Sequence, residues 1–166
     1  MASDPRMTAE ERAHVTRLLE ESQSEFFSLV DDIGEAAEHI MMNEAFFLGV
    51  VQRALESPAD PDWQAKTAGK NELLERVLVD RSQKATAPEL LQPRGTGKEE
   101  VIRRFRESRA RTLEFAGSTQ LPLKAHTREH PFPVFRTLNA YQWLLYIPLH
   151  NQRHNQQLAA IRKRLA

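Results

Sequence analysis

The chain has 166 residues, no cysteine and a formal net charge of zero, with 40% hydrophobic and 28% charged residues. This composition is typical of one globular domain and excludes a wholly disordered chain. The lack of cysteine excludes disulfides, thiolate metal sites, iron–sulfur clusters and a cysteine nucleophile, so any bound metal needs His, Asp or Glu ligands.

The distribution of apolar and charged residues points to a cytoplasmic protein. No apolar run is long enough to cross a membrane, and residues 1–12 lack the hydrophobic core of a secretory signal. Residues 1–60 carry thirteen acidic and four basic side chains, whereas residues 130–166 carry five basic and no acidic ones. This polarity favours internal packing of the two ends, and we expect no membrane and no nucleic-acid partner.

The N-terminal third predicts two long helices after a flexible tail at residues 1–7. From residue 8 to residue 30, apolar residues recur at steps of three and four, and Thr8 and Glu11 have capping-box spacing. A second helix is predicted over residues 33–55, ended by the prolines at positions 58 and 61. The predicted stripes are Val15, Leu18, Leu19, Ser22, Phe26, Leu29 and Val30, then Ala36, Ile40, Phe47, Val51 and Ala54.

The remaining chain predicts a short helix over residues 71–81, a loop marked by Pro and Gly residues between 88 and 97, and a third long helix over 98–116. Residues 117–133 are expected to be irregular, and a fourth long helix is predicted over 135–165, kinked at Pro148. No segment alternates as a strand does. We therefore predict one all-α domain over residues 1–166, a four-helix bundle of up-down type with a long irregular connection.

Three histidines are the candidate metal ligands. His150 and His154 lie four residues apart on a predicted helix, so their rings project from the same face and can clamp one divalent ion. His39 lies beside the apolar stripe of the second helix and is the candidate third ligand. The alternative is that the pair is solvated or separately hydrogen-bonded and that His39 is a packed core residue.

Two known types of metal site are disfavoured. The zincin helix places a catalytic Glu directly after its first His, but Asn151 stands there. A di-iron bundle needs Glu three residues before His, whereas Glu35 and Glu38 precede His39 by four residues and by one. The sequence therefore disfavours both a metalloprotease of the zincin type and a ferritin-like di-iron protein.

The AEHI segment around His39, together with LHNQRHNQQL in the last helix, resembles the DinB-like superfamily, which is related to the YfiT-like metal-dependent hydrolases. The similarity extends over residues 8–165 and is strongest in the last helix. It implies a four-helix bundle, frequently dimeric, with a metal held by His39, His150 and His154. Relatives usually have a longer loop between the first two helices than residues 31–34 provide here.

The resemblance also implies a function. It indicates a divalent-metal-dependent transferase using a low-molecular-weight thiol, or a hydrolase, acting on a small molecule, with zinc or nickel as the metal. Asn43, Tyr146 and Gln157 lie within a turn of the ligands and can orient water or substrate, or make ordinary interior hydrogen bonds. No catalytic residue is evident, so the alternative is a non-catalytic protein, either metal-stabilised or a stress-response binding protein.

Several other features are interpreted as structural. The 94–98 segment, RGTGK, lacks the first Gly and the final Ser or Thr of a phosphate loop, and is expected to be a loop that enters the third helix. The arginines of that helix alternate with glutamates and predict a solvated face rather than a nucleic-acid site; they are Arg103, Arg104, Arg106, Arg109 and Arg111. His126 and His130 stand among prolines and are predicted loop residues.

A homodimer is also expected. The resemblance implies it, and Phe46, Phe47, Trp143 and Tyr146 add more large apolar surface to the second and fourth helices than one core stripe needs.

Overall fold

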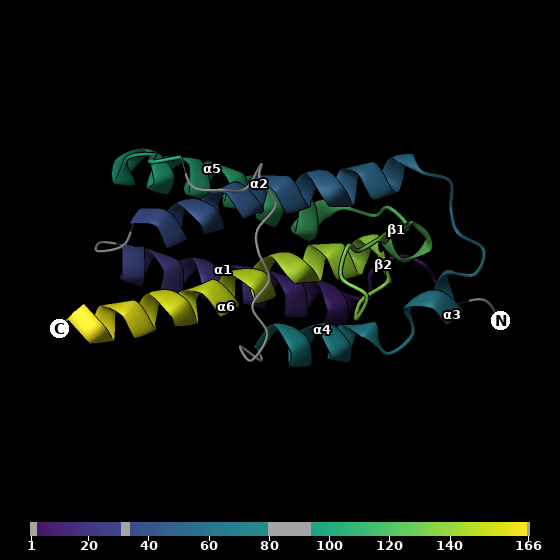
Figure 1. The fold of residues 1–166 in the computed structure, drawn as a ribbon. Coiled ribbons are helices and arrows are strands. Elements are labelled where there is room, and N and C mark those ends of the chain that lie inside the picture. Colours follow the sequence, from purple (N-terminus) through teal and green to yellow (C-terminus); the bar gives the residue numbers. More distant parts are fainter. Residues whose placement is uncertain (1–2, 31–33, 80–93, 166) are drawn as a thin grey trace.

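Four long helices lie side by side along the length of the molecule (Figure 1). The structure is a computed structural model, and it describes residues 3–30, 34–79 and 94–165. The long helices are α1 (Ala9–Leu29), α2 (Gly34–Glu56), α5 (Lys98–Ser118) and α6 (Ala140–Leu165). Both α1 and α2 pack against α5 and α6, which closes the bundle. The predicted all-α four-helix fold is confirmed.

The chain returns along the bundle between its second and third long helices. In Figure 1, α1 and α6 run in one direction, and α2 and α5 run in the opposite one. Because α2 and α5 are parallel, the chain must return along the bundle between them. Two short helices make part of this return, α3 (Trp63–Thr67) and α4 (Lys70–Val79), and α4 packs against α6.

The predicted stripes explain why the long helices pack as they do. On α1 the capping box forms as expected: Thr8 accepts from the backbone N–H of Glu11, and the Glu11 carboxylate accepts from the backbone N–H of Thr8. Most residues of the two N-terminal stripes are buried, namely Val15, Leu18, Leu19, Ser22, Phe26, Val30, Ile40, Phe47, Val51 and Ala54. The core is thus built largely from the periodic positions.

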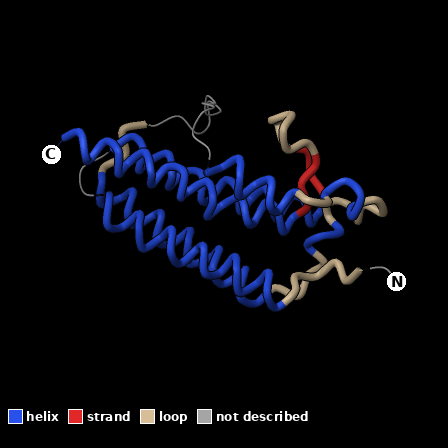
Figure 2. Tube along the Cα trace, turned by 90° about the horizontal axis from the view of Figure 1, so that it is seen from below, coloured by secondary structure: helices blue, strands red, loops and turns tan. Residues whose placement is uncertain are grey.

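A small hairpin departs from the prediction for residues 117–139. A 3₁₀ turn (Leu123–Ala125) leads into β1 (Thr127–Glu129), which pairs antiparallel with β2 (Thr137–Asn139). Figure 2 places these strands at the end of the bundle where the N-terminus lies. The last helix therefore begins at Ala140 instead of residue 135. Asn139 and Gln142 fix this start, because each side chain accepts a hydrogen bond from the other's backbone N–H.

The last helix ends at Leu165 as predicted, with Pro148 inside it. The N-terminal end differs from the prediction. Part of the expected N-terminal tail is held against the bundle: Met7 packs in the core, and the Pro5 carbonyl accepts a hydrogen bond from the backbone N–H of Lys124. The short joint at residues 31–33, and the first part of the predicted loop at 88–93, lie outside the described residues.

The arginines of α5 are exposed as predicted, with one exception. Arg103 and Arg104 are ion-paired with glutamates of their own helix, and Arg106 stacks over the Phe27 ring. The exception is Arg109, which is completely buried. The prediction of a solvated face was wrong for this residue. Its guanidinium is paired with the buried Glu44 carboxylate inside the bundle and is not solvated by water.

Replacing Arg103 and Arg106 together with alanine is therefore expected to leave metal content, activity and thermal midpoint close to those of the wild type. Exposed ion pairs contribute little because water and salt screen them. Thermal unfolding and metal analysis of the double variant check this. Loss of function at unchanged stability would instead place this face of α5 in a binding site.

The aromatic residues on which the predicted dimer contact depends lie largely inside one chain. Phe47, Trp143 and Tyr146 are buried within one chain, and Phe46 packs partly against the same core. The homodimer therefore stays a prediction that depends on the family resemblance. Among the described residues, no helix is both long and apolar enough to span a lipid bilayer.

Candidate metal centre

The bundle brings His39 together with two histidines that lie more than one hundred residues further along the chain. His39 lies on α2, and His150 and His154 lie one turn apart on α6, the helix against which α2 packs. One ring nitrogen from each histidine lies within 4.8 Å of the others, and all three side chains are partly buried. Among the histidines and carboxylates of the described residues, these three histidines form the group whose possible ligand atoms lie close enough together to hold a metal ion.

His150 and His154 of α6 face each other through their Nε2 atoms. Their Nε2 atoms are 3.2 Å apart, and the Nδ1 atom of His154 lies 2.6 Å from Oε1 of Gln157. An amide oxygen only accepts, so the Nδ1 of His154 carries the proton and its Nε2 presents a lone pair. Gln157 thus fixes the tautomer that a metal ligand requires.

Asn43 has the corresponding position beside His150. Its side-chain amide nitrogen lies 3.3 Å from Nδ1 of His150, while its Oδ1 is buried without a partner. An amide nitrogen only donates, so the Nδ1 of His150 accepts this hydrogen bond and the neutral ring carries its proton on Nε2. That N–H lies 3.2 Å from the Nε2 of His154, to which it can donate. A divalent ion that takes both Nε2 atoms as ligands displaces this proton.

Aromatic side chains wall the same side of α6. The Tyr146 ring is stacked on His150 at 5.5 Å between centroids, and Phe47 meets the His150 ring edge at 5.3 Å. Burial lowers the pKa of His150 well below its usual value, and the nearby His154 and His39 lower it further. Burial raises the pKa of Tyr146. At neutral pH, His150 is therefore neutral and Tyr146 is a phenol.

Two carboxylates of α2 that lie close to His39 in the sequence, Glu38 and Glu44, are engaged elsewhere. The Glu44 carboxylate is paired with the buried Arg109, at 2.6 and 2.8 Å. The Glu38 carboxylate accepts hydrogen bonds from the loop that precedes α5. Burial alone would raise the pKa of Glu38, but the hydrogen bonds from Thr96 and the loop backbone outweigh it and lower that pKa.

The sequence did not identify the partners of Glu38 or Arg109. The 94–97 segment is a loop entering α5, as predicted, but it binds a carboxylate of this chain. The helical period indicates that Arg109 faces the core. It lies four residues after the buried Phe105 and three before the buried Thr112.

The two predicted loop histidines have different environments. Both lie outside the helices, and Nδ1 of His126 lies 2.8 Å from the Ser57 carbonyl oxygen. His130 is 7% exposed, and its ring is stacked on Trp143 at 4.9 Å. Its Nδ1 accepts a hydrogen bond from the backbone N–H of Phe132. Burial lowers the pKa of His130 to about 4.

Acid is therefore expected to destabilise the fold through His130. Its pKa lies below the 6.5 of an unperturbed histidine, so the unfolded chain binds more protons between those values, and stability falls as the pH drops from 7 to 4. The full shift corresponds to ~3 kcal/mol, and we expect about 2 kcal/mol because solvent reaches part of the ring. Urea unfolding at both pH values measures it. Equal pH profiles for the wild type and His130→Phe would contradict the prediction.

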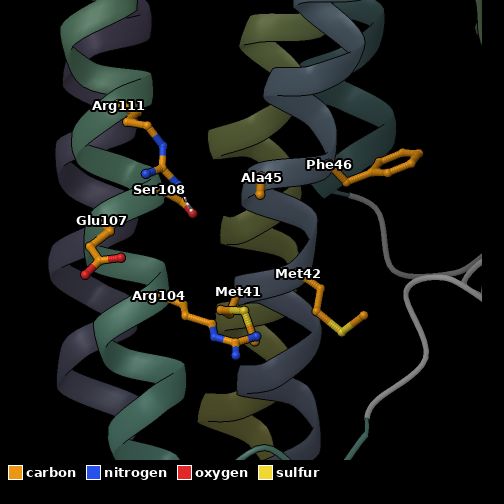
Figure 3. Close-up of a pocket in the computed structure, with 8 residues that line it drawn as sticks. All are labelled: Met41, Met42, Ala45, Phe46, Arg104, Glu107, Ser108 and Arg111. Carbon is orange, nitrogen blue, oxygen red and sulfur yellow. Dashed lines mark hydrogen bonds between the residues drawn. The ribbon is translucent and has the colours of Figure 1, made fainter.

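A separate groove of about 420 Å³ lies between α2 and α5 and holds none of the three histidines. Its walls include Met41 and Ala45 of α2 and Arg104 of α5. Figure 3 shows that Met42 and Phe46, at its edge, point away from α5. The groove is thus distinct from the histidine cluster.

The fold and the cluster define a class of protein, a four-helix bundle with three convergent histidines between its second and last long helices. Comparison with family models gives the same result, because the DinB superfamily model matches residues 28–158. The chain belongs to the DinB superfamily. No curated protein and no solved structure matches it.

Proposed function

We propose that His39, His150 and His154 hold one divalent metal ion, and that the protein is a metal-dependent enzyme acting on a small molecule. The observation that carries this proposal is the convergence of the three ring nitrogens within 4.8 Å. Two of them come from rings whose other nitrogen has an amide partner. Neutral imidazoles suit zinc and nickel equally, and we propose one of these two.

Each side chain around the cluster has a role in this proposal. Gln157 accepts from the Nδ1–H of His154, Asn43 donates to the Nδ1 of His150, and the two amides so orient the two rings. Tyr146 and Phe47 cover the His150 ring and limit the access of water. When bound, a divalent ion with three neutral ligands supplies a Lewis acid that lowers the pKa of a water molecule or a thiol.

Among the candidate reactions, transfer of a low-molecular-weight thiol is favoured over hydrolysis. Hydrolysis commonly uses a carboxylate or histidine as general base. Among the α2 glutamates near His39 whose side chains the structure describes, Glu38 and Glu44 are both engaged in buried hydrogen bonds. A thiol that is deprotonated at a metal needs no such base, and it also supplies the nucleophile that a chain without cysteine lacks.

The same engaged carboxylates also favour a second candidate, a non-catalytic metal-stabilised or stress-response binding protein. Two measurements separate the candidates. The first is metal content of the protein purified without chelator, where we expect about one ion per chain. The second is turnover of an electrophilic aromatic substrate with low-molecular-weight thiols, and of model esters without them, before and after chelation.

The outcomes are distinct. Thiol-dependent turnover that chelation abolishes and added metal restores supports the transferase. Ester turnover alone supports the hydrolase. Bound metal that raises the thermal midpoint without any turnover supports the non-catalytic candidate, and failure to bind zinc or nickel would overturn the metal proposal.

A further inference from the structure

The loop before α5 wraps around a single carboxylate of α2. The backbone N–H of Arg94 donates to both oxygens of Glu38 at 2.9 Å, and those of Gly95 and Thr96 donate at 3.1 and 3.3 Å. The Thr96 hydroxyl adds a hydrogen bond of 2.5 Å. Glu38 is only 2% exposed, so these donors take the place of its water.

The loop is built for an anion. Gly95 has a φ of +76°, a conformation that residues with a side chain rarely adopt, and it turns three successive N–H groups toward one point. The loop also leads directly into α5, whose positive N-terminal end favours a negative charge nearby. Glu38 therefore binds there as a fixed anion, and the contact joins α2 to the start of α5.

This contact lies next to a proposed ligand. Successive residues of a helix point ~100° apart, so Glu38 can bind the loop before α5 while the adjacent His39 faces α6. His39 is in the second turn of α2, which begins at Gly34, and the first turns of a helix fray most easily. Anchoring at Glu38 thus restrains the part of α2 that carries His39.

We propose that Glu38 and the Arg94–Thr96 loop form a latch that positions His39 relative to the histidines of α6. This inference rests on the metal site proposed above and assigns to Glu38 a positioning role. Without the latch, α6 still presents His150 and His154, but the third ligand loses its fixed distance from them.

Glu38→Gln tests the latch because an amide keeps the size of the carboxylate but places N–H groups against the N–H groups of the loop. We expect affinity for zinc, measured by chelator competition, to fall about tenfold or more, as is typical when a group that orients a ligand is lost. The absorption spectrum of the cobalt-loaded protein should also change, which a purely structural role would not produce. Thr96→Val removes one donor and should weaken affinity by a smaller factor.

The matched control is Glu107→Gln, an exposed glutamate of α5 paired with Arg103, which should leave both readouts unchanged. Wild type and His150→Ala are measured alongside. If the wild type binds no metal, the metal site itself is wrong. If it binds and Glu38→Gln has the same affinity and cobalt spectrum, the latch is overturned. Should Glu38→Gln not fold, Thr96→Val decides, and wild-type affinity for zinc in this variant overturns the latch.

Discussion

Alanine at His150 is expected to reduce bound metal from about one ion per chain to a trace, while the bundle stays folded. Alanine at His39 or at His154 should do the same, because two imidazoles bind a divalent ion far more weakly than three converging ones. The three rings are partly buried and contribute little to the apolar stripes, so far-UV circular dichroism should show wild-type helix content.

Metal analysis of single variants purified in parallel measures this effect. His126→Ala and His130→Ala serve as controls, since neither belongs to the cluster, and they should retain the metal. Full occupancy in the His39 or His154 variant, or loss in the His126 variant, would show that the ligand set is wrong. Acid should also release the metal below about pH 6.5, because ligation requires neutral imidazoles, and tight binding shifts the release to lower pH.

The long helices could be predicted because each repeats apolar residues at the helical period over five or more turns. The strands could not, since three residues are too few to show alternation and the segment between them is rich in proline. The start of α6 was predicted about five residues too early for the same reason. The capping pair of Asn139 and Gln142 was the local signal that marks Ala140 as its first residue.

The candidate site was predictable to different degrees. The spacing of His150 and His154 places both rings on one face, which local geometry dictates. The place of His39 beside an apolar stripe made it a candidate, and the family resemblance joined it to the pair, because no local pattern shows which distant helix packs on α6. The latch was not predictable, because Glu38 and its loop lie 56 to 58 residues apart and pair only in the folded chain.

The RGTGK segment shows why a motif needs its context. Its sequence lacks two residues of a phosphate loop and predicts a loop entering α5, which the structure confirms. Its Gly95 and successive N–H groups nevertheless bind an anion, because the geometry of such loops follows from the backbone. The anion in this case is a carboxylate supplied by the neighbouring helix.

Disrupting the buried ion pair of Arg109 and Glu44 is expected to have the largest effect on stability. Arg109 on α5 donates to both oxygens of Glu44 on α2, to the Leu19 carbonyl and Ser22 hydroxyl of α1, and to Asn151 of α6. One guanidinium thus joins all four long helices. Either Arg109→Met or Glu44→Leu leaves its partner's charge buried and unpaired, which costs about 3–5 kcal/mol.

The double variant, Arg109→Met with Glu44→Leu, distinguishes a true pair from two independent contacts. Removing both charges removes the unpaired ion, so the double variant should lose less unfolding free energy than the two single losses added together. The loss should not vanish, because Asn151 and the Leu19 carbonyl still lack their donor. Urea unfolding followed by circular dichroism measures all four proteins. Additive losses would contradict the coupling, and single losses below about 1 kcal/mol would show that water reaches the pair in solution.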